Sequence, residues 1–337
     1  MNRSSHVARA TLAVLATASL ALGIGVLTVS AVKDIPIGIA KFVSHPALDD
    51  IERGIVDELT ATVPGVRFDL QNANADMATA AQIARKFKSD KVSVAVGIAT
   101  PTAQALASAI KDIPVVFSAV TDPVAAGLVS SYQGGGKNVT GTSDMTPVAA
   151  QLDLLVALKP IKRLGHVYNA GEANSVKLAE LVRSYCSGHG ITLVESTVAN
   201  SSEVRQAIQS IADRIDGLYL GNDNTVFSAV NAVAEVCLQK HLPLVTADPT
   251  SAETVPVLAA LGFDYYQMGR ATGRMVARIL KGEKPGSMPT YFPNAPAEKS
   301  LVLNLDIAAR LGLTPSADLI AKATVVIRNG AIERRAK

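Results

Sequence analysis

The sequence predicts an α/β protein made of two lobes, each a parallel sheet flanked by helices. Short runs rich in β-branched residues alternate with longer helical patterns through the first half, and the same alternation starts again near residue 164. Two of the runs, 92–99 and 115–120, are almost wholly apolar, as expected of strands that helices cover on both faces. The repeated pattern therefore indicates two sheets and not one continuous sheet.

The first half contains five expected strands and four expected helices. The strands are predicted at residues 35–40, 66–71, 92–99, 115–120 and 139–142. The helices are predicted at residues 47–62, 76–89, 101–111 and 123–130.

The second half repeats this alternation and then adds a third segment. Strands are predicted at residues 164–168, 192–198, 217–220, 243–247 and 257–263, with weaker candidates at 301–305 and 325–328. Helices are predicted at residues 148–158, 173–189, 202–214, 225–241 and 266–281, the last one ended by Gly282 and Pro285.

The first 31 residues have the pattern of an export signal. Arg3 and Arg9 precede an uncharged run from Ala10 to Val29, which ends on the small-residue pattern Val29-Ser30-Ala31. We therefore predict a signal peptide over residues 1–31 and a periplasmic protein. An uncleaved membrane anchor stays the alternative, because about 20 apolar residues can span a bilayer. No cysteine stands directly after the apolar run, which argues against a lipid anchor.

The net charge and the amino-acid composition argue against a nucleic-acid-binding protein. The formal net charge is +3, and two of the basic residues lie in the predicted signal, so the remainder is close to neutral. Such a chain lacks the basic field of a nucleic-acid-binding protein. Hydrophobic residues make up 48% of the 337 residues and aromatic residues 4%, with no Trp, which is typical of a packed α/β protein. The length suits two domains.

Cysteine and histidine usage argues against a metal site. Cys186 and Cys237 fall in different predicted helices, and we interpret them as buried free thiols. A disulfide between them stays open, because the sequence does not give their Cα separation. The histidines are isolated from one another, so we expect no metal and no cofactor.

The loops after the predicted strands are rich in Ser, Thr, Asn and Asp and poor in basic residues. In an open parallel sheet, ligands bind beyond the carboxyl ends of the strands, where helix N-termini offer free N–H groups. Hydroxyl and N–H groups suit a ligand carboxylate and Asp suits an ammonium, so the pattern points to a zwitterion such as an amino acid. For any one of these residues, a helix N-cap is the alternative role. His45 is a possible ligand contact, although a lone His is more often structural.

Nucleotide and catalytic motifs are missing from the sequence. The run Gly134-Gly135-Gly136-Lys137-Asn138 lacks the glycine spacing and the Ser/Thr of a phosphate loop, so we expect a turn there. No G-x-G-x-x-G follows the first predicted strand, and no G-x-S-x-G elbow exists. We therefore expect a binding protein and no enzyme.

Several segments carry a family resemblance: residues 37–49, 69–73, 76–80, 98–104, 118–129, 138–145, 168–175, 223–226 and 261–269. Together they resemble the ABC-transporter substrate-binding proteins of the tryptophan/tyrosine-type family, over nearly all of residues 36–284. The resemblance implies two flavodoxin-like lobes joined by a hinge of three crossings, the type I periplasmic-binding-protein architecture. We place the first lobe at 34–146 plus about 262–285, and the second at 147–261 plus about 286–330.

The resemblance also implies ligand contacts from the loops after the strands. The positions that match are Ser118, Thr121, Asp122, Asn169, Asn174, Ser175, Asp223 and Asp248. Phe42, His45 and Thr100, which follow the first and third strands, complete the predicted site. An aromatic-stacking pocket would use Phe42, Tyr168 or Phe227.

We therefore expect a monomeric, extracytoplasmic solute-binding protein of an ABC importer, which closes on a small solute and presents it to an inner-membrane permease. An amino acid is the expected solute, held through its ammonium by Asp122 or Asp223. Tryptophan, tyrosine, phenylalanine, a branched-chain amino acid and a non-amino-acid solute stay open. A membrane-tethered or exported ligand-sensing domain that signals to a receptor is the alternative function.

Overall fold

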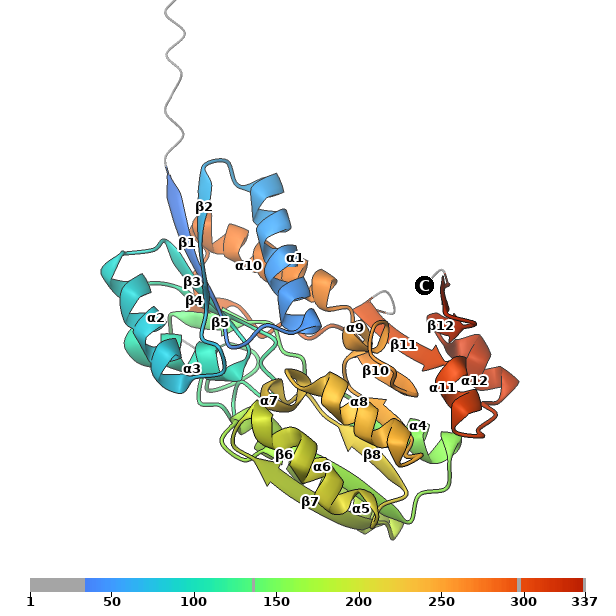
Figure 1. Ribbon diagram of the computed structural model, residues 1–337. Helices are drawn as coiled ribbons and strands as arrows, with labels where there is room; N and C mark the ends of the chain where they lie inside the picture. Colours follow the sequence, from blue (N-terminus) through green and yellow to red (C-terminus); the bar gives the residue numbers. More distant parts are fainter. Residues whose placement is uncertain (1–33, 135–136, 296–297, 336–337) are drawn as a thin grey trace, which may run out of the picture. The chain divides into compact units, whose positions relative to one another are not determined.

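The computed structural model describes residues 34–134, 137–295 and 298–335, and its strands form two separate sheets (Figure 1). The two-sheet prediction is therefore confirmed. The predicted signal peptide lies outside the described residues. Within the described part of the chain, no helix combines the length and apolar character needed to cross a membrane.

The first sheet is entirely parallel, as predicted, with the strand order β2-β1-β3-β4-β5. Its central strands β3 and β4 are buried along their whole length, because helices cover both faces of the sheet. The strands are β1 (Ile35–Lys41), β2 (Val66–Asn72), β3 (Val94–Ile98), β4 (Val115–Ser118) and β5 (Val139–Gly141). The helices that connect them are α1 (Pro46–Thr62), α2 (Met77–Ser89) and α3 (Thr100–Ala109).

The second sheet has eight strands in the order β13-β12-β11-β10-β9-β8-β6-β7. It is parallel from β7 through β10, but β11 runs antiparallel to β10, and β13 runs antiparallel to β12. The strands are β6 (Arg163–Asn169), β7 (Thr192–Val198), β8 (Gly217–Leu220), β9 (Leu244–Thr246), β10 (Ala259–Phe263), β11 (Lys299–Asn304), β12 (Val325–Arg328) and β13 (Ala331–Arg334). The prediction of a purely parallel sheet is wrong at this edge, because the chain enters β11 after an excursion to the other sheet.

The remaining helices flank the second sheet, except for one that packs on the first. They are α4 (Val148–Leu158), α5 (Ala173–His189), α6 (Val204–Ala212), α7 (Asn224–Phe227), α8 (Val230–Gln239), α9 (Pro249–Ala252), α11 (Leu305–Arg310) and α12 (Ala317–Lys322). The exception is α10 (Tyr265–Leu280), whose residues join the core of the first sheet. We call the first sheet with α1, α2, α3 and α10 the first lobe, and the second sheet with its helices the second lobe.

Two helix predictions are wrong and several short elements were not predicted. Residues 123–130 form turns and no helix, because the Asp122 carboxylate accepts hydrogen bonds from the Val124 and Ala125 N–H groups and closes the chain on itself. The helix expected at 225–241 is two helices, α7 and α8. The elements α9, α11, α12 and β13 span only four to six residues each, too few for a periodic pattern to show.

The helix α10 lies along α1 although the two are about 200 residues apart in the sequence (Figure 1). Glycines allow this close approach: a Cβ atom at Gly269 would lie 2.3 Å from the Ile51 carbonyl oxygen, and one at Gly54 would lie 2.3 Å from the Tyr266 carbonyl oxygen. The buried Glu58 of α1 also forms an ion pair with Arg270 of α10, at 2.8 Å. The last long helix is therefore part of the first lobe.

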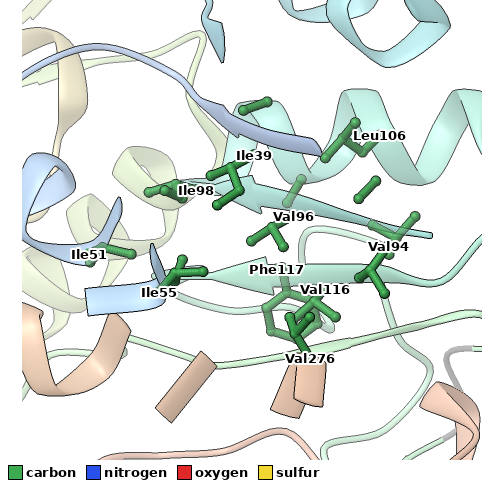
Figure 2. Close-up of a cluster of buried hydrophobic side chains, with 14 of the residues drawn as sticks. Ile39, Ile51, Ile55, Val94, Val96, Ile98, Leu106, Val116, Phe117 and Val276 are labelled. Atoms are coloured by element: carbon green, nitrogen blue, oxygen red, sulfur yellow. The ribbon is translucent and has the colours of Figure 1, made fainter. Parts of the chain in front are cut away.

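Each lobe has its own apolar core. In the first lobe, Ile39, Val96 and Phe117 of the sheet pack with Ile55 of α1 and Val276 of α10, as Figure 2 shows. The second sheet is covered by one cluster on each face. Both cysteines are buried free thiols in this lobe, which confirms the preferred interpretation.

The chain passes between the lobes three times: after β5, between β10 and α10, and before β11. The first and third crossings run side by side, because Thr142 bridges Tyr291 and the Ser143 N–H donates to the Tyr291 carbonyl at 2.8 Å. The buried Gln151 joins the first crossing to β10, the strand that leads into the second crossing, since its amide nitrogen donates to the Thr146 hydroxyl and to the Leu261 carbonyl. The crossings thus form one connected hinge.

The α1–α10 packing gives a testable prediction. Gly269→Ala should lower the free energy of unfolding by about 1–3 kcal/mol, because the new methyl group meets backbone that cannot move aside. Gly188→Ala in α5 is the matched control: nothing lies within 4 Å of its Cβ position, so it should be neutral or stabilise by about 0.5–1 kcal/mol. Urea unfolding of both variants measures this. Equal effects at the two positions would contradict the close packing.

Candidate ligand-binding site

A small cavity of about 20 Å³ lies at the carboxyl ends of the strands of both sheets. It therefore occupies the place that the parallel topology predicts for a ligand. Both lobes and the second crossing line it, through His45, Ala47, Leu48, Ala119, Thr121, Asp144, Asn174, Asn222, Asp223, Asn224, Phe227, Asp248 and Tyr265.

Three carboxyl groups line the cavity, and none of its lining residues is Lys or Arg. Asp144, Asp223 and Asp248 are all buried. Burial raises the pKa of Asp144 and of Asp248 to about 6, and burial together with the charge of Glu172 raises the pKa of Asp223. The three carboxyl groups therefore favour a ligand group of positive charge in the cavity.

Two of these carboxylates are helix N-caps. Asp223 caps α7 by accepting from the Val226 N–H at 2.8 Å, and it also accepts from the Asn169 N–H. Asp248 caps α9 by accepting from the Thr250 N–H at 2.8 Å and from the Ser251 hydroxyl. Both carboxylates therefore stabilise helix N-termini, which is the role given above as the alternative to ligand contact.

Asp144 differs from the other two because it caps no helix, and besides its own backbone N–H it is held by side chains. Its carboxylate accepts from the Thr121 hydroxyl at 3.1 Å and from the Asn222 amide nitrogen at 2.8 Å. Thr121 belongs to the first lobe and Asn222 to the second, so this carboxylate links the lobes across the cavity. A second link, outside the cavity, is the ion pair of Lys177 with Asp122 at 3.5 Å.

Two buried amide oxygens in the cavity wall have no hydrogen-bond partner among the described residues: Asn174 Oδ1 and Asn222 Oδ1. The nitrogens of the same side chains are engaged, since Asn174 donates to the Asn222 carbonyl and Asn222 donates to Asp144. Buried acceptors of this kind normally have a partner. These two oxygens can accept hydrogen bonds from a donor group of a ligand.

The second-lobe wall is held by one buried carboxylate, Glu172. It accepts from the Thr225 N–H at 3.0 Å, from the Thr225 hydroxyl and from the amide nitrogens of Asn174 and Asn224. This network fixes the side chains that face the cavity before any ligand arrives. Such pre-organisation lowers the ordering cost of binding.

Apolar and aromatic side chains complete the cavity. The His45 and Phe227 rings, one from each lobe, lie 5.9 Å apart between centroids, next to Ala47 and Leu48 at the start of α1. Tyr265 begins α10, and burial raises the pKa of its hydroxyl well above the usual value. The site thus offers an aromatic wall together with buried carboxylates.

Of the site residues predicted from the sequence, five line the cavity: His45, Thr121, Asn174, Asp223 and Asp248. Ser175 is buried beside it, in contact with the Asn174 amide. The cavity also takes in Phe227, one of the three aromatic residues considered for stacking.

The other predicted residues lie elsewhere. The Ser118 hydroxyl bonds to the Thr142 and Thr272 hydroxyls inside the first lobe, and Thr100 is buried at the start of α3. Asp122, an expected ammonium partner, caps its own turn and accepts from the Tyr132 hydroxyl at 2.8 Å. Phe42 and Asn169 line a separate open groove near α2 and β7.

Sequence reasoning missed Asp144, Asn222, Asn224 and Tyr265. Asn222 and Asn224 flank Asp223, which the sequence predicts, whereas Asp144 stands in the loop after β5, from which no residue is predicted. Tyr265 follows β10 directly, and only the hinge places it in the cavity.

Among the described residues, no group of three or more His, Cys, Asp or Glu could hold a metal ion.

The sequence profile of the ABC transporter substrate binding protein family matches residues 36–327. The chain belongs to this family. A relative from Clostridioides difficile, described as a tyrosine-binding protein, is 36% identical over 282 residues, which cover 82% of this chain and 81% of the relative. Members are binding proteins and not enzymes, and they are extracytoplasmic.

Two solved structures of substrate-binding proteins bear on the site. A Streptococcus pneumoniae protein in complex with L-Trp is 33% identical, covers 88% of this chain and 100% of its own, and has a TM-score of 0.83. The ligand-free, open structure of a substrate-binding protein with adhesive properties from Clostridium difficile is 38% identical, covers 84% and 96%, and has a TM-score of 0.63. Solute-binding proteins of about 15% identity share the fold as well, which confirms the expected architecture.

The open relative has the higher sequence identity but the lower TM-score. Sequence divergence therefore does not account for the difference in structural similarity. The contacts between the lobes described above, from Asn222 to Asp144 and from Lys177 to Asp122, fit an arrangement closer to the ligand-bound relative.

The raised pKa of Asp248 gives a testable prediction. A carboxyl group with a pKa raised to about 6 in the folded state stabilises that state at low pH, and this contribution is lost as the pH rises through about 6. Asp248→Asn keeps the N-cap but does not ionise. We expect the wild type to gain free energy of unfolding relative to Asp248→Asn as the pH falls from 8 to 4.5, measured by urea unfolding. A difference that is constant with pH would show that Asp248 is not perturbed.

Proposed function

We propose that this protein binds an aromatic L-amino acid in the cavity between its lobes and delivers it to an ABC permease. One observation carries the proposal: a single cavity combines buried carboxylates with the aromatic side chains of His45, Phe227 and Tyr265. Relatives described as binding tyrosine and L-Trp support the ligand class.

We assign the ligand ammonium to Asp144, with the free oxygens of Asn174 and Asn222 as further acceptors. Asp144 replaces Asp122 in this role, because Asp122 lies outside the cavity. Asp223 and Asp248 add negative charge to the site while they cap their helices. Thr121 and the backbone after β4, where Ala119 has a left-handed φ of 52°, form the wall for the ligand carboxylate.

The lobes would open and close about the three crossings. We propose the lobe bounds expected from the sequence, 34–146 plus about 262–285 and 147–261 plus about 286–330. The strand membership of the two sheets and the packing of α10 on α1 support this division. Closure on a ligand excludes water from the carboxylates and strengthens their attraction for the ammonium.

The signal-like pattern of residues 1–31 supports periplasmic delivery, as does the location of the family. In this scheme the closed, loaded form is what the permease recognises. We propose that the protein acts as a monomer, because each chain contains both walls of the cavity.

Ligand binding is tested by isothermal titration and thermal shift with L-tyrosine, L-tryptophan, L-phenylalanine and L-leucine. At least one aromatic amino acid should raise the melting temperature, since a ligand at 100 times its dissociation constant stabilises by about 2.7 kcal/mol. Asp144→Ala should reduce the affinity by at least about tenfold, the cost of losing one charged hydrogen bond. Asp112→Asn, on an exposed loop, is the control and should bind normally. No response to any amino acid would reject the proposed function.

The same ion pair predicts a pH dependence. A bound ammonium lowers the pKa of Asp144 below the value of about 6 that it has without ligand. Affinity should therefore be highest above pH 6 and should fall as the pH drops below it, by up to about tenfold per pH unit. Asp144→Asn should bind more weakly and with a flatter profile. Titrations at pH 7.5, 6 and 5 measure this, and an affinity that rises on acidification would contradict the assignment.

A further inference from the structure

His45 is a buried polar side chain in the cavity wall, beside Asn224. It is 9% exposed, and neither Nδ1 nor Nε2 has a hydrogen-bond partner of ordinary geometry among the described residues. It stands at the N-cap position of α1 but makes no side-chain capping bond there. One ring nitrogen can pair with Asn224, and the other is left without a partner among the described residues, although buried polar groups normally have one.

The other buried histidine shows what a structural role looks like. His166 lies in β6, its Nδ1 contacts the Tyr219 carbonyl at 3.1 Å, and its ring stacks on Tyr168 and Tyr219. The Nε2 of His166 also has no hydrogen-bond partner among the described residues, but, unlike His45, His166 does not line the cavity. His45 has the cavity in front of it and no comparable carbonyl contact.

His45 also lies at the aromatic end of the site. The charges that act on it are those of Asp49 and Lys41, outside the cavity, and the cavity carboxylates do not contribute. Tyr265, by contrast, is influenced by Asp144 and Asp248. With Phe227 as its ring neighbour, the His45 imidazole is placed for the side chain of the ligand rather than for the ammonium.

The imidazole is neutral at physiological pH, because burial lowers the pKa of His45 to about 4. A neutral imidazole has one N–H donor and one acceptor nitrogen. The neighbouring Asn224 donates to Glu172 through its amide nitrogen, and its bond with His45 raises the pKa of the imidazole, as expected when a ring N–H donates to the Asn224 amide oxygen. An N–H directed at Asn224 leaves the other nitrogen as an acceptor toward the cavity.

We propose that His45 determines specificity: its acceptor nitrogen binds the donor on an aromatic ring, a phenol O–H or an indole N–H, and so selects tyrosine or tryptophan over phenylalanine. The inference rests on the proposed function, since it concerns the side-chain end of the same site. A site built to bond a ligand donor discriminates against the analogue that lacks it, because the buried acceptor is then left without a partner.

The test compares three ligands and three proteins by isothermal titration at pH 7.5. The wild type should bind the better of tyrosine and tryptophan at least about tenfold more tightly than phenylalanine. His45→Phe keeps an aromatic ring without nitrogen, so it should lose this preference while phenylalanine affinity stays within about twofold. His45→Gln retains an acceptor and should restore part of the preference.

Three results would overturn the inference. One is equal affinity of the wild type for all three amino acids. Another is an equal loss for all three in His45→Phe, which would place the imidazole at the ammonium or carboxylate. The third is no binding of any aromatic amino acid to the wild type, and only this result also rejects the proposed function.

If His45→Phe does not fold, the wild type decides the matter. In protein labelled with ¹⁵N-histidine, the preferred ligand should shift the ring-nitrogen signals of His45, and phenylalanine should shift them less. His166 serves as the internal control, because its ring lies outside the cavity and its signals should not change. Identical shifts with both ligands would contradict the inference.

Discussion

The site depends on buried acidic side chains that no Lys or Arg in the cavity wall neutralises. Asp144, Asp223 and Asp248 face one cavity without a Lys or Arg in its wall, and burial raises the pKa of each. An arrangement of this kind costs stability unless a cation completes it. The site is therefore electrostatically incomplete without a ligand, and an ammonium group supplies what it lacks.

The rest of the structure holds these groups in place. Caps at α7 and α9 position two of the carboxylates, and Glu172 holds the asparagines beside them. The hinge is stiffened by Gln151 and by the pairing of Thr142 with Tyr291. Asp144 is bonded from both lobes, so the group to which we assign the ligand ammonium also links the two walls of the cavity.

Much of the fold could be predicted because the pattern of each strand is local. The apolar runs that became β3 and β4 are buried on both faces, and their composition reports this directly. The failures have physical causes of their own. The turn after Asp122 depends on one side chain bonding its own backbone, and the antiparallel β11 depends on where the chain returns from the other lobe. Likewise, Ser118 and Asp144 both stand at strand ends in the sequence. Only the packing shows that Ser118 lies in the core and that Asp144 lines the cavity.

The sequence by itself determined the two-sheet α/β class, the edge of the sheets that carries the site and the family. These follow from short-range periodicity and from residue types, which are properties of neighbouring positions. Only the tertiary structure decided which strand-end residues meet in one cavity, that α10 belongs with α1, and that His45 lies beside Asn224 and Phe227 in the cavity wall. Those outcomes depend on contacts between residues far apart along the chain, and local sequence carries no record of such contacts.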